Sequence, residues 1–175
     1  MSTSLSTKIT PTVSDINRAD IIPQEFLTRG PTLQEIFDIQ DRLAQGTPVD
    51  MPTMNQWAPH VCLRSIFMPA DSFVVGKMHR TEHFNIILKG SVTVLMEDGP
   101  QRFDAPCVFI SKAGVKKVLY NHTDVWWAVP HVTETTTEEA LEAEVIMPED
   151  RLRDSKTGKL LVDCLEQLQL MLGEV

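Results

Sequence analysis

The segment GKMHRTEHFNIILKG, residues 76–90, holds two histidines four residues apart, His79 and His83, at the start of a strand-like run. Side chains alternate between the two faces of an extended segment, so the even spacing predicts that both imidazoles point to the same side. A third histidine, His131, follows in a later strand-like stretch. Three imidazoles on one side of a sheet could bind a divalent metal (Zn, Fe, Mn or Ni) or transfer protons near neutral pH. Further candidate ligands for such a metal are His60, Glu82 and Glu134.

The elements that must position these histidines are short strands separated by turns, between about residues 60 and 147. Lys89-Gly90 and Asp98-Gly99 are strong turn signals. The predicted strands are residues 61–68, 72–75, 83–89, 91–97, 107–111, 115–121, 124–132 and 142–147. Many short strands without alternating helices predict an all-β sandwich or barrel.

A helix is predicted ahead of the strands, in the segment PTLQEIFDIQDRLAQG. Thr32 and Glu35 have the spacing of a capping box, and the apolar residues that follow fall on one face. Gly46 is expected to end the helix. A second helix is predicted at the C-terminus from an apolar stripe of Leu161, Cys164, Leu165, Leu168, Met171 and Leu172.

These patterns predict one domain with irregular flanks. The first residues form a Ser/Thr-rich arm that packs on the domain or on a partner subunit, and a proline-rich connection follows the first helix. We therefore divide the chain into an arm, a helix with its connection, a barrel and a C-terminal helical segment, at residues 1–30, 31–59, 60–148 and 149–175.

The composition is that of a globular protein, with 175 residues of which 42% are hydrophobic and 23% charged. The net charge of −8 argues against binding to nucleic acid or to an anionic membrane, because phosphates repel an acidic surface. No apolar run approaches the length of a membrane span, and the N-terminus lacks the apolar core of a secretory signal. Since Cys62, Cys107 and Cys164 have no metal-binding spacing, we expect reduced cysteines and a cytoplasmic protein.

Gly90 and the basic residues before it, His83, His79 and Lys77, have a recognisable spacing. They resemble the first motif of the cupin superfamily, G-x5-H-x-H-x3-4-E-x6-G, with Gly90 as the closing glycine. Counting back, His83 falls at the glutamate position, His79 at the second histidine and Lys77 at the first. In the family these positions bind a metal, whereas a protonated lysine has no lone pair to give one.

Gly114, Lys117 and Asn121 resemble the second cupin motif, G-x5-P-x-G-x2-H-x3-N. Gly114 matches the turn glycine, Lys117 falls at the third histidine, and Asn121 matches the closing asparagine. The resemblance covers roughly residues 60–132. It implies a single cupin barrel of the double-stranded β-helix, or jelly-roll, type, which commonly forms dimers.

Residues 74–100, 105–120 and 124–136 also resemble small uncharacterised cupin-like proteins that bacteriophages and prophages encode. This resemblance implies a phage-encoded protein that acts in the cytoplasm of a bacterial host. It brings no known reaction with it.

Three hypotheses for the pocket remain open. In the first, His79, His83 and His131 bind a metal in a small-molecule pocket, and catalysis uses His79, His83 and Lys77. In the second, Lys77 and Lys117 replace the metal and hold an anion, and a lysine of lowered pKa acts as a base or forms a Schiff base. That arrangement would suit isomerisation or epimerisation of an acidic sugar. In the third, the chain has no active site and is a dimeric interaction module.

The candidate residues for ligand binding are Lys117, Arg64, Tyr120 and Trp127. Arg64 joins an anion pocket if its face of the first strand points inward, and is a solvated charge if that face points outward. Trp126 and Trp127 are adjacent on a strand, so they are expected to face opposite sides. A homodimer is expected, with the arm and the C-terminal stripe as contact surfaces, and the expected ligand is a small anionic molecule or a sugar.

Overall fold

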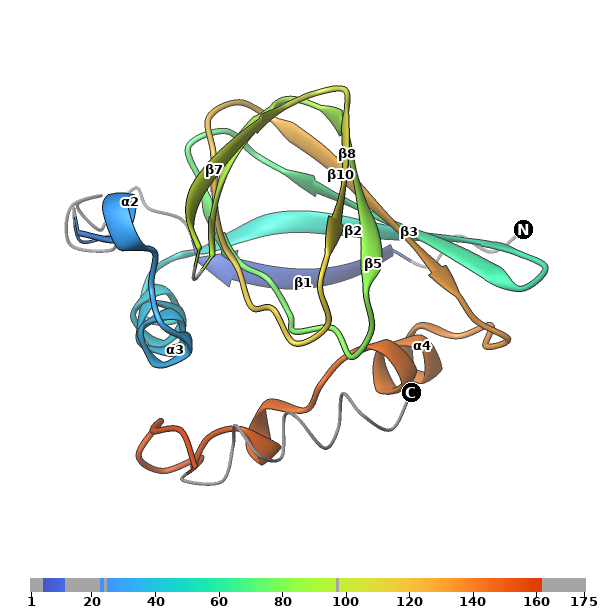
Figure 1. The fold of residues 1–175 in the computed structure, drawn as a ribbon. Helices are drawn as coiled ribbons and strands as arrows, with labels where there is room; N and C mark the ends of the chain where they lie inside the picture. Colours follow the sequence, from blue (N-terminus) through green and yellow to red (C-terminus); the bar gives the residue numbers. More distant parts are fainter. Residues whose placement is uncertain (1–4, 12–22, 24, 97, 162–175) are drawn as a thin grey trace.

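A computed structural model describes residues 5–11, 23, 25–96 and 98–161, which are built mainly from two antiparallel sheets (Figure 1). The larger sheet has the order β1-β2-β3-β10-β5-β8, formed by Leu5–Pro11, Pro48–Ala58, Val61–Met68, Val125–Val132, His83–Lys89 and Cys107–Ser111. The smaller sheet has the order β4-β9-β6-β7, formed by Phe73–Val75, Val118–Asn121, Ser91–Met96 and Gly99–Asp104. The helices are α2 (Phe26–Arg29), α3 (Leu33–Leu43), α4 (Glu138–Val145) and the short 3-10 helix η1 (Glu149–Arg151).

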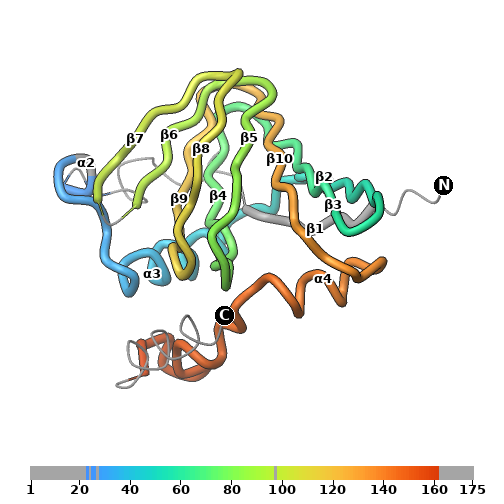
Figure 2. The backbone as a smooth tube through the Cα atoms, turned by 45° about the vertical axis from the view of Figure 1, so that its right-hand side comes forward, coloured from blue at the N-terminus to red at the C-terminus, as the bar shows by residue number. Residues whose placement is uncertain are grey.

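The main hydrophobic core lies between the two sheets, which face each other as the walls of a barrel (Figures 1 and 2). It joins Met51 and Ile87 of the larger sheet to Val92, Val94 and Leu119 of the smaller one. The all-β jelly-roll class expected from the sequence is therefore confirmed. Within the described ranges, no helix is both long and apolar enough to cross a membrane.

Most of the strand and turn predictions for the barrel are confirmed. β3, β5 and β8 have the expected bounds, β6 has the expected start, β4 and β10 are one residue shorter than expected, and β9 begins three residues later. Gly90 makes the turn between β5 and β6 with a φ of +94°, and a Cβ there would lie 2.2 Å from the carbonyl oxygen of Asp124. Only glycine fits such a position without strain. β7 was not predicted, because residues 100–102 are all exposed and show no alternation.

The proline-rich connection expected at residues 47–59 is wrong, because most of it forms β2. Proline lacks the N–H that a ladder needs, which argues against a central strand. Pairing with β3 begins at Thr53, however, so Pro48 and Pro52 pair only with β1. Since β1 belongs to the N-terminal arm, the described part of the arm packs on its own domain.

The strand expected at residues 142–147 is also wrong, because the chain forms α4 and continues with Ile146 in an isolated bridge to His79. The Thr137 side chain accepts a hydrogen bond from the N–H of Ala140 and begins the helix. Leu141 and Val145, four residues apart, are both buried on one face of α4. The strand was predicted because polar and apolar residues alternate over residues 142–145.

The predicted first helix is confirmed as α3. Thr32 and Glu35 form the expected capping box, and Arg29 binds the Glu35 carboxylate at 2.7 Å. The helix ends at Leu43, with Ala44 at its C-cap, rather than at Gly46.

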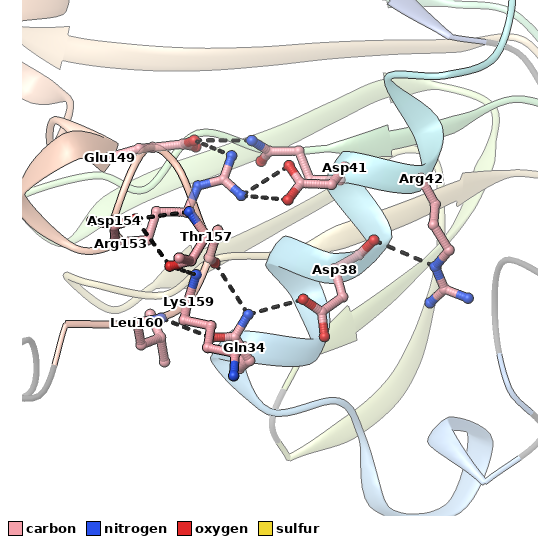
Figure 3. A network of polar contacts seen from close by, with 12 residues as sticks. Gln34, Asp38, Asp41, Arg42, Glu149, Arg153, Asp154, Thr157, Lys159 and Leu160 are labelled. Carbon is pink, nitrogen blue, oxygen red and sulfur yellow. Dashed lines mark hydrogen bonds and ion pairs between the residues drawn. The ribbon is translucent and has the colours of Figure 1, made fainter.

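Residues 146–161, here called the strap, follow α4 and run along the same end of the barrel (Figure 2). Arg153 of the strap contacts α3, because it donates to both carboxylate oxygens of Asp41 at 2.8 Å (Figure 3). Its guanidinium also lies over the ring of Phe37. These contacts position α4 and the strap against the barrel. The apolar stripe predicted to form a C-terminal helix lies, beyond its first residue, in 162–175 and outside the described residues.

Candidate functional site

A cavity of about 220 Å³ lies inside the barrel. Both sheets contribute apolar side chains to its wall, among them Met51, Ile66, Met68, Val74, Leu119 and Trp127. Val145 of α4 and Ile146 of the strap also line it. The sequence-predicted site residues in its wall are Arg64, Lys77, His79, Lys117, Trp127 and His131. Folding therefore brings most of the candidate residues to one mainly apolar chamber.

Lys117 is the most unusual group in this wall. Its residue is only 4% exposed, and its Nζ donates a hydrogen bond to the Ser111 hydroxyl. Burial lowers the pKa of Lys117 to about 8. Among the described residues no carboxylate pairs with it, so a buried ammonium is left with one neutral partner at the edge of a cavity. An unpaired buried charge of this kind is costly for the fold.

The partner of Lys117 belongs to a small buried network that the sequence did not reveal. The Asn85 amide donates to the Ser111 hydroxyl at 2.9 Å, and the Trp127 indole N–H donates to the Asn85 carbonyl oxygen at 3.2 Å. Through these bonds, Trp127 and Asn85 hold the Ser111 oxygen at a defined position next to the Lys117 amine. The sequence signal for this network was Asn85, a polar residue at a buried position of β5.

The adjacent lysine, Lys116, is also buried, and burial lowers its pKa too, but it has a carboxylate partner. Its side chain is 1% exposed, and its Nζ lies 2.6 Å from the Glu149 carboxylate. It also donates to the Gly76 carbonyl and lies over the Phe37 ring. Lys116 therefore has the partners of a structural residue, which Lys117 lacks.

The three histidines come together as the spacing predicted. The His79 ring stacks on His83 with centroids 3.9 Å apart and on His131 at 5.5 Å. His83 does not line the cavity itself. Its Nδ1 lies 3.0 Å from the Thr81 carbonyl oxygen, so Nδ1 carries the proton and Nε2 presents a lone pair. That Nε2 and the Nδ1 of His79 are buried without a hydrogen-bond partner among the described residues.

Burial keeps all three imidazoles neutral at pH 7. Desolvation, with the neighbouring histidines and Lys117, lowers the pKa of His79 to about 2. Desolvation likewise lowers the pKa of His131 to about 4 and also lowers that of His83. Neutral imidazoles can accept a proton or a hydrogen bond but cannot anchor an anion by charge.

Two further cations at the cavity are paired with α4. Arg64 points inward, and its Nη2 donates to the carboxylates of Glu138 at 3.0 Å and Glu142 at 2.9 Å. Lys77 also donates to Glu142, at 2.8 Å. These glutamates balance the positive charge of Arg64 and Lys77. Among the cavity cations in the described ranges, only Lys117 is without such a partner.

Of the two aromatic candidates for ligand binding, Trp127 lies in the cavity wall and Tyr120 does not. Trp127 is 5% exposed in the cavity wall, whereas Trp126 is 42% exposed on the outer side, as expected from their adjacency. Tyr120 lies away from the cavity, with its hydroxyl donating to Asp71 at 2.8 Å and its ring against Phe73. The structure thus places Tyr120 outside the site in which we expected it.

The histidine arrangement does not fit a resident metal ion. The two unpartnered histidine nitrogens are what a metal would satisfy, but a metal also needs three lone pairs to converge on one point. The stacked rings of His79 and His131 are only 13° from parallel, which directs their nitrogens side by side. Within the ranges that the structure describes, no three His, Cys, Asp or Glu side chains form a group that could hold a metal. The charge of Lys117, which lowers the pKa of both His79 and His83, would also repel a cation.

No family model matches the sequence, and a search of curated proteins gives no match. Several similar solved structures are named as cupin proteins. A cupin superfamily protein from Desulfitobacterium hafniense is 10% identical, with a TM-score of 0.41 over 48% of this chain and 78% of its own. The cupin domain of Schizosaccharomyces pombe Cnp3 is 20% identical (TM-score 0.41; 54% and 72% covered). A predicted oxalate decarboxylase from Thermotoga maritima is 14% identical (0.41; 49% and 83%). At these identities the likeness concerns the fold alone.

Proposed function

We propose that this chain binds a small organic acid with an apolar body inside the barrel, with the acid's carboxylate at Lys117. The observation that carries the proposal is the buried ammonium of Lys117, which has a hydroxyl and no carboxylate as its described partner. A bound carboxylate would supply the missing charge through charge-assisted hydrogen bonds. The mainly apolar wall of the cavity suits a hydrocarbon body.

The same wall argues against the acidic sugar considered from the sequence. Every sugar hydroxyl that enters a cavity must find a hydrogen-bond partner or lose its hydration without compensation. Most of the wall is apolar, including Met51, Ile66 and Leu119. Two of its polar side chains, Arg64 and Lys77, are already paired with α4. A branched or aromatic carboxylic acid suits both the Lys117 ammonium and the apolar wall. Action in the cytoplasm of a phage-infected host stays a prediction from the sequence.

Calorimetric titration with 4-methylpentanoate tests the proposal. We expect saturable binding to the wild type and a weakening of about tenfold or more in Lys117→Met, because one charge-assisted hydrogen bond contributes about 1.5–3 kcal/mol. Lys116→Met is the matched control, which removes a neighbouring buried lysine but not the proposed anchor, and it should bind as the wild type does. No binding by the wild type, or equal binding by Lys117→Met, would overturn the proposal.

We further propose that the protein is a homodimer that pairs through the outer face of β5 and β8. The strands β5 and β8 are neighbours in the larger sheet. On their outer face, four apolar side chains are each more than half exposed: Phe84, Leu88, Val108 and Ile110. In a chain of net charge −8, an uncharged apolar face is where two copies can meet without repulsion. Sedimentation velocity should show a dimer that Ile110→Lys converts to a monomer. Val132→Lys, at an exposed position on β10 outside this face, should leave the dimer intact, and a wild-type monomer would contradict the proposal.

A further inference from the structure

A buried lysine amine in the wall of a cavity can do more than hold an anion. The Nζ of Lys117 lies in the wall of the chamber, is almost completely shielded from solvent, and is fixed by the Ser111 hydroxyl. Burial without a carboxylate partner raises the share of the neutral amine, which is the form that attacks a carbonyl carbon. Lys116, held by Glu149 at 2.6 Å, has no such freedom.

We infer that Lys117 forms a reversible imine with a small 2-oxo acid bound in the cavity. This inference rests on the proposed function, because the acid group of the ligand is the group already assigned to Lys117. The iminium keeps the positive charge on nitrogen, and the carboxylate is attached to the carbon that the nitrogen bonds. The ion pair that favours binding therefore survives the reaction.

The step balances without an oxidant or a reductant. The Nζ lone pair forms a bond to the carbonyl carbon while the π electrons of C=O move to oxygen. One proton then passes from nitrogen to that oxygen, which gives a carbinolamine. The proton that the Lys117 ammonium released before the attack then leaves with the oxygen as water while the C=N bond forms, so the iminium carries the same charge as the starting ammonium. Hydrolysis by one water reverses the sequence and returns the free amine.

The histidine stack supplies a group for the proton transfers. His83 and Ser111 are opposite each other in the β5–β8 ladder, and Lys117 donates to Ser111. The Nε2 of His83 is buried, carries a lone pair and has no partner among the described residues. Ser111 positions the amine, and we assign the unpartnered Nε2 of His83, on the neighbouring strand, as the base that accepts its proton and returns it to the leaving oxygen. In this scheme Lys117 is the catalytic residue, and Ser111 is a positioning residue.

Reductive trapping tests the inference. The full-length wild type is incubated with 4-methyl-2-oxopentanoate and sodium cyanoborohydride, and its intact mass is measured. We expect an increase equal to the mass of the oxo acid less one oxygen atom, with peptide mapping placing the adduct on Lys117. Excess 4-methylpentanoate, which has the same body and no carbonyl, should suppress the adduct by competition.

The controls separate this inference from the proposed function. Lys117→Met should lose the adduct, and Lys116→Met should keep it at the wild-type level. If 4-methylpentanoate binds in a Lys117-dependent manner but the oxo acid gives no adduct at Lys117, the imine is refuted and the binding function stands. If neither compound binds to the wild type, both fail. An adduct spread over several exposed lysines, and insensitive to the competitor, would also refute the imine.

Discussion

Lys117→Met is expected to make the folded protein more stable, and Lys116→Met is expected to make it less stable. The Lys117 ammonium is buried beside one hydroxyl, and its pKa falls from 10.5 to about 8 because burial disfavours the charge. A shift of that size corresponds to about 3 kcal/mol of destabilisation at neutral pH. Methionine fills much of the same volume without a charge. The substitution removes that penalty, and Ser111 keeps its bond from Asn85.

Lys116→Met should have the opposite effect because its charge is paired. It removes the 2.6 Å ion pair with Glu149 and the contact with the Phe37 ring. Glu149 keeps its hydrogen bond from Gln40, so we expect a loss of about 1–3 kcal/mol. Urea unfolding of both variants at pH 7 measures the difference in the free energy of unfolding. A loss of stability in Lys117→Met as large as that in Lys116→Met would show that Lys117 is structural.

The pH dependence gives a second measure of the same charge. Because the pKa of Lys117 is lower in the folded state, the unfolded state binds more protons between about pH 8 and pH 10.5. The free energy of unfolding contributed by this group therefore rises with pH through that window. The stability gap between Lys117→Met and the wild type should narrow from pH 7 to pH 10. A gap independent of pH would mean that the Lys117 charge does not cause it.

Stability gained by removing a side chain that binds ligand is expected of a functional site. The folded protein tolerates an uncompensated charge at Lys117, and the ligand's carboxylate would supply the compensation. The His79, His83 and His131 stack has a similar character, since it leaves two buried nitrogens without partners. Lys117, His79 and His131, all in the wall of one cavity, thus combine burial with incomplete pairing or lowered pKa values.

Local patterns were enough to predict most of the barrel. The alternating runs that became β3, β5 and β8, the glycine turn at Gly90 and the capping box of α3 each depend on residues close in sequence. β2 depends on a tertiary partner, because its prolines are accommodated only where it pairs with β1. α4 depends on the burial of Leu141 and Val145, which the alternation over residues 142–145 concealed.

The sequence predicted which residues gather at the site better than it predicted which of their charges are paired. The spacing of His79 and His83 did predict that their rings meet. The motif spacing singled out Lys117 over Lys116, but no local pattern predicts that Glu149 of the strap pairs with Lys116 alone. The pairing of Arg64 likewise depends on Glu138 and Glu142, in a segment whose helical structure was not foreseen. Long-range ion pairs of this kind leave no local pattern to detect.

The second large effect should be a loss of stability in acid that originates in the histidine stack. The pKa of His131 is lowered from 6.5 to about 4 and that of His79 to about 2, chiefly by burial. Between pH 6.5 and these values the unfolded state binds more protons than the folded state. The free energy of unfolding therefore falls as the pH falls, by about 3 kcal/mol from His131 alone between roughly pH 6.5 and pH 4.

His131→Gln removes this titration and keeps a polar side chain at the position. Urea unfolding at pH 7, 6, 5 and 4 should show a shallower pH dependence in this variant than in the wild type, whatever its stability at pH 7. His60→Gln is the control, because His60 is exposed and paired with Glu134. Its pH dependence should follow the wild type. If His131→Gln and the wild type lose stability in parallel, the pKa of His131 is the same in the folded and unfolded states. Burial would then not disfavour the charged form of His131, and the acid sensitivity would originate elsewhere in the protein.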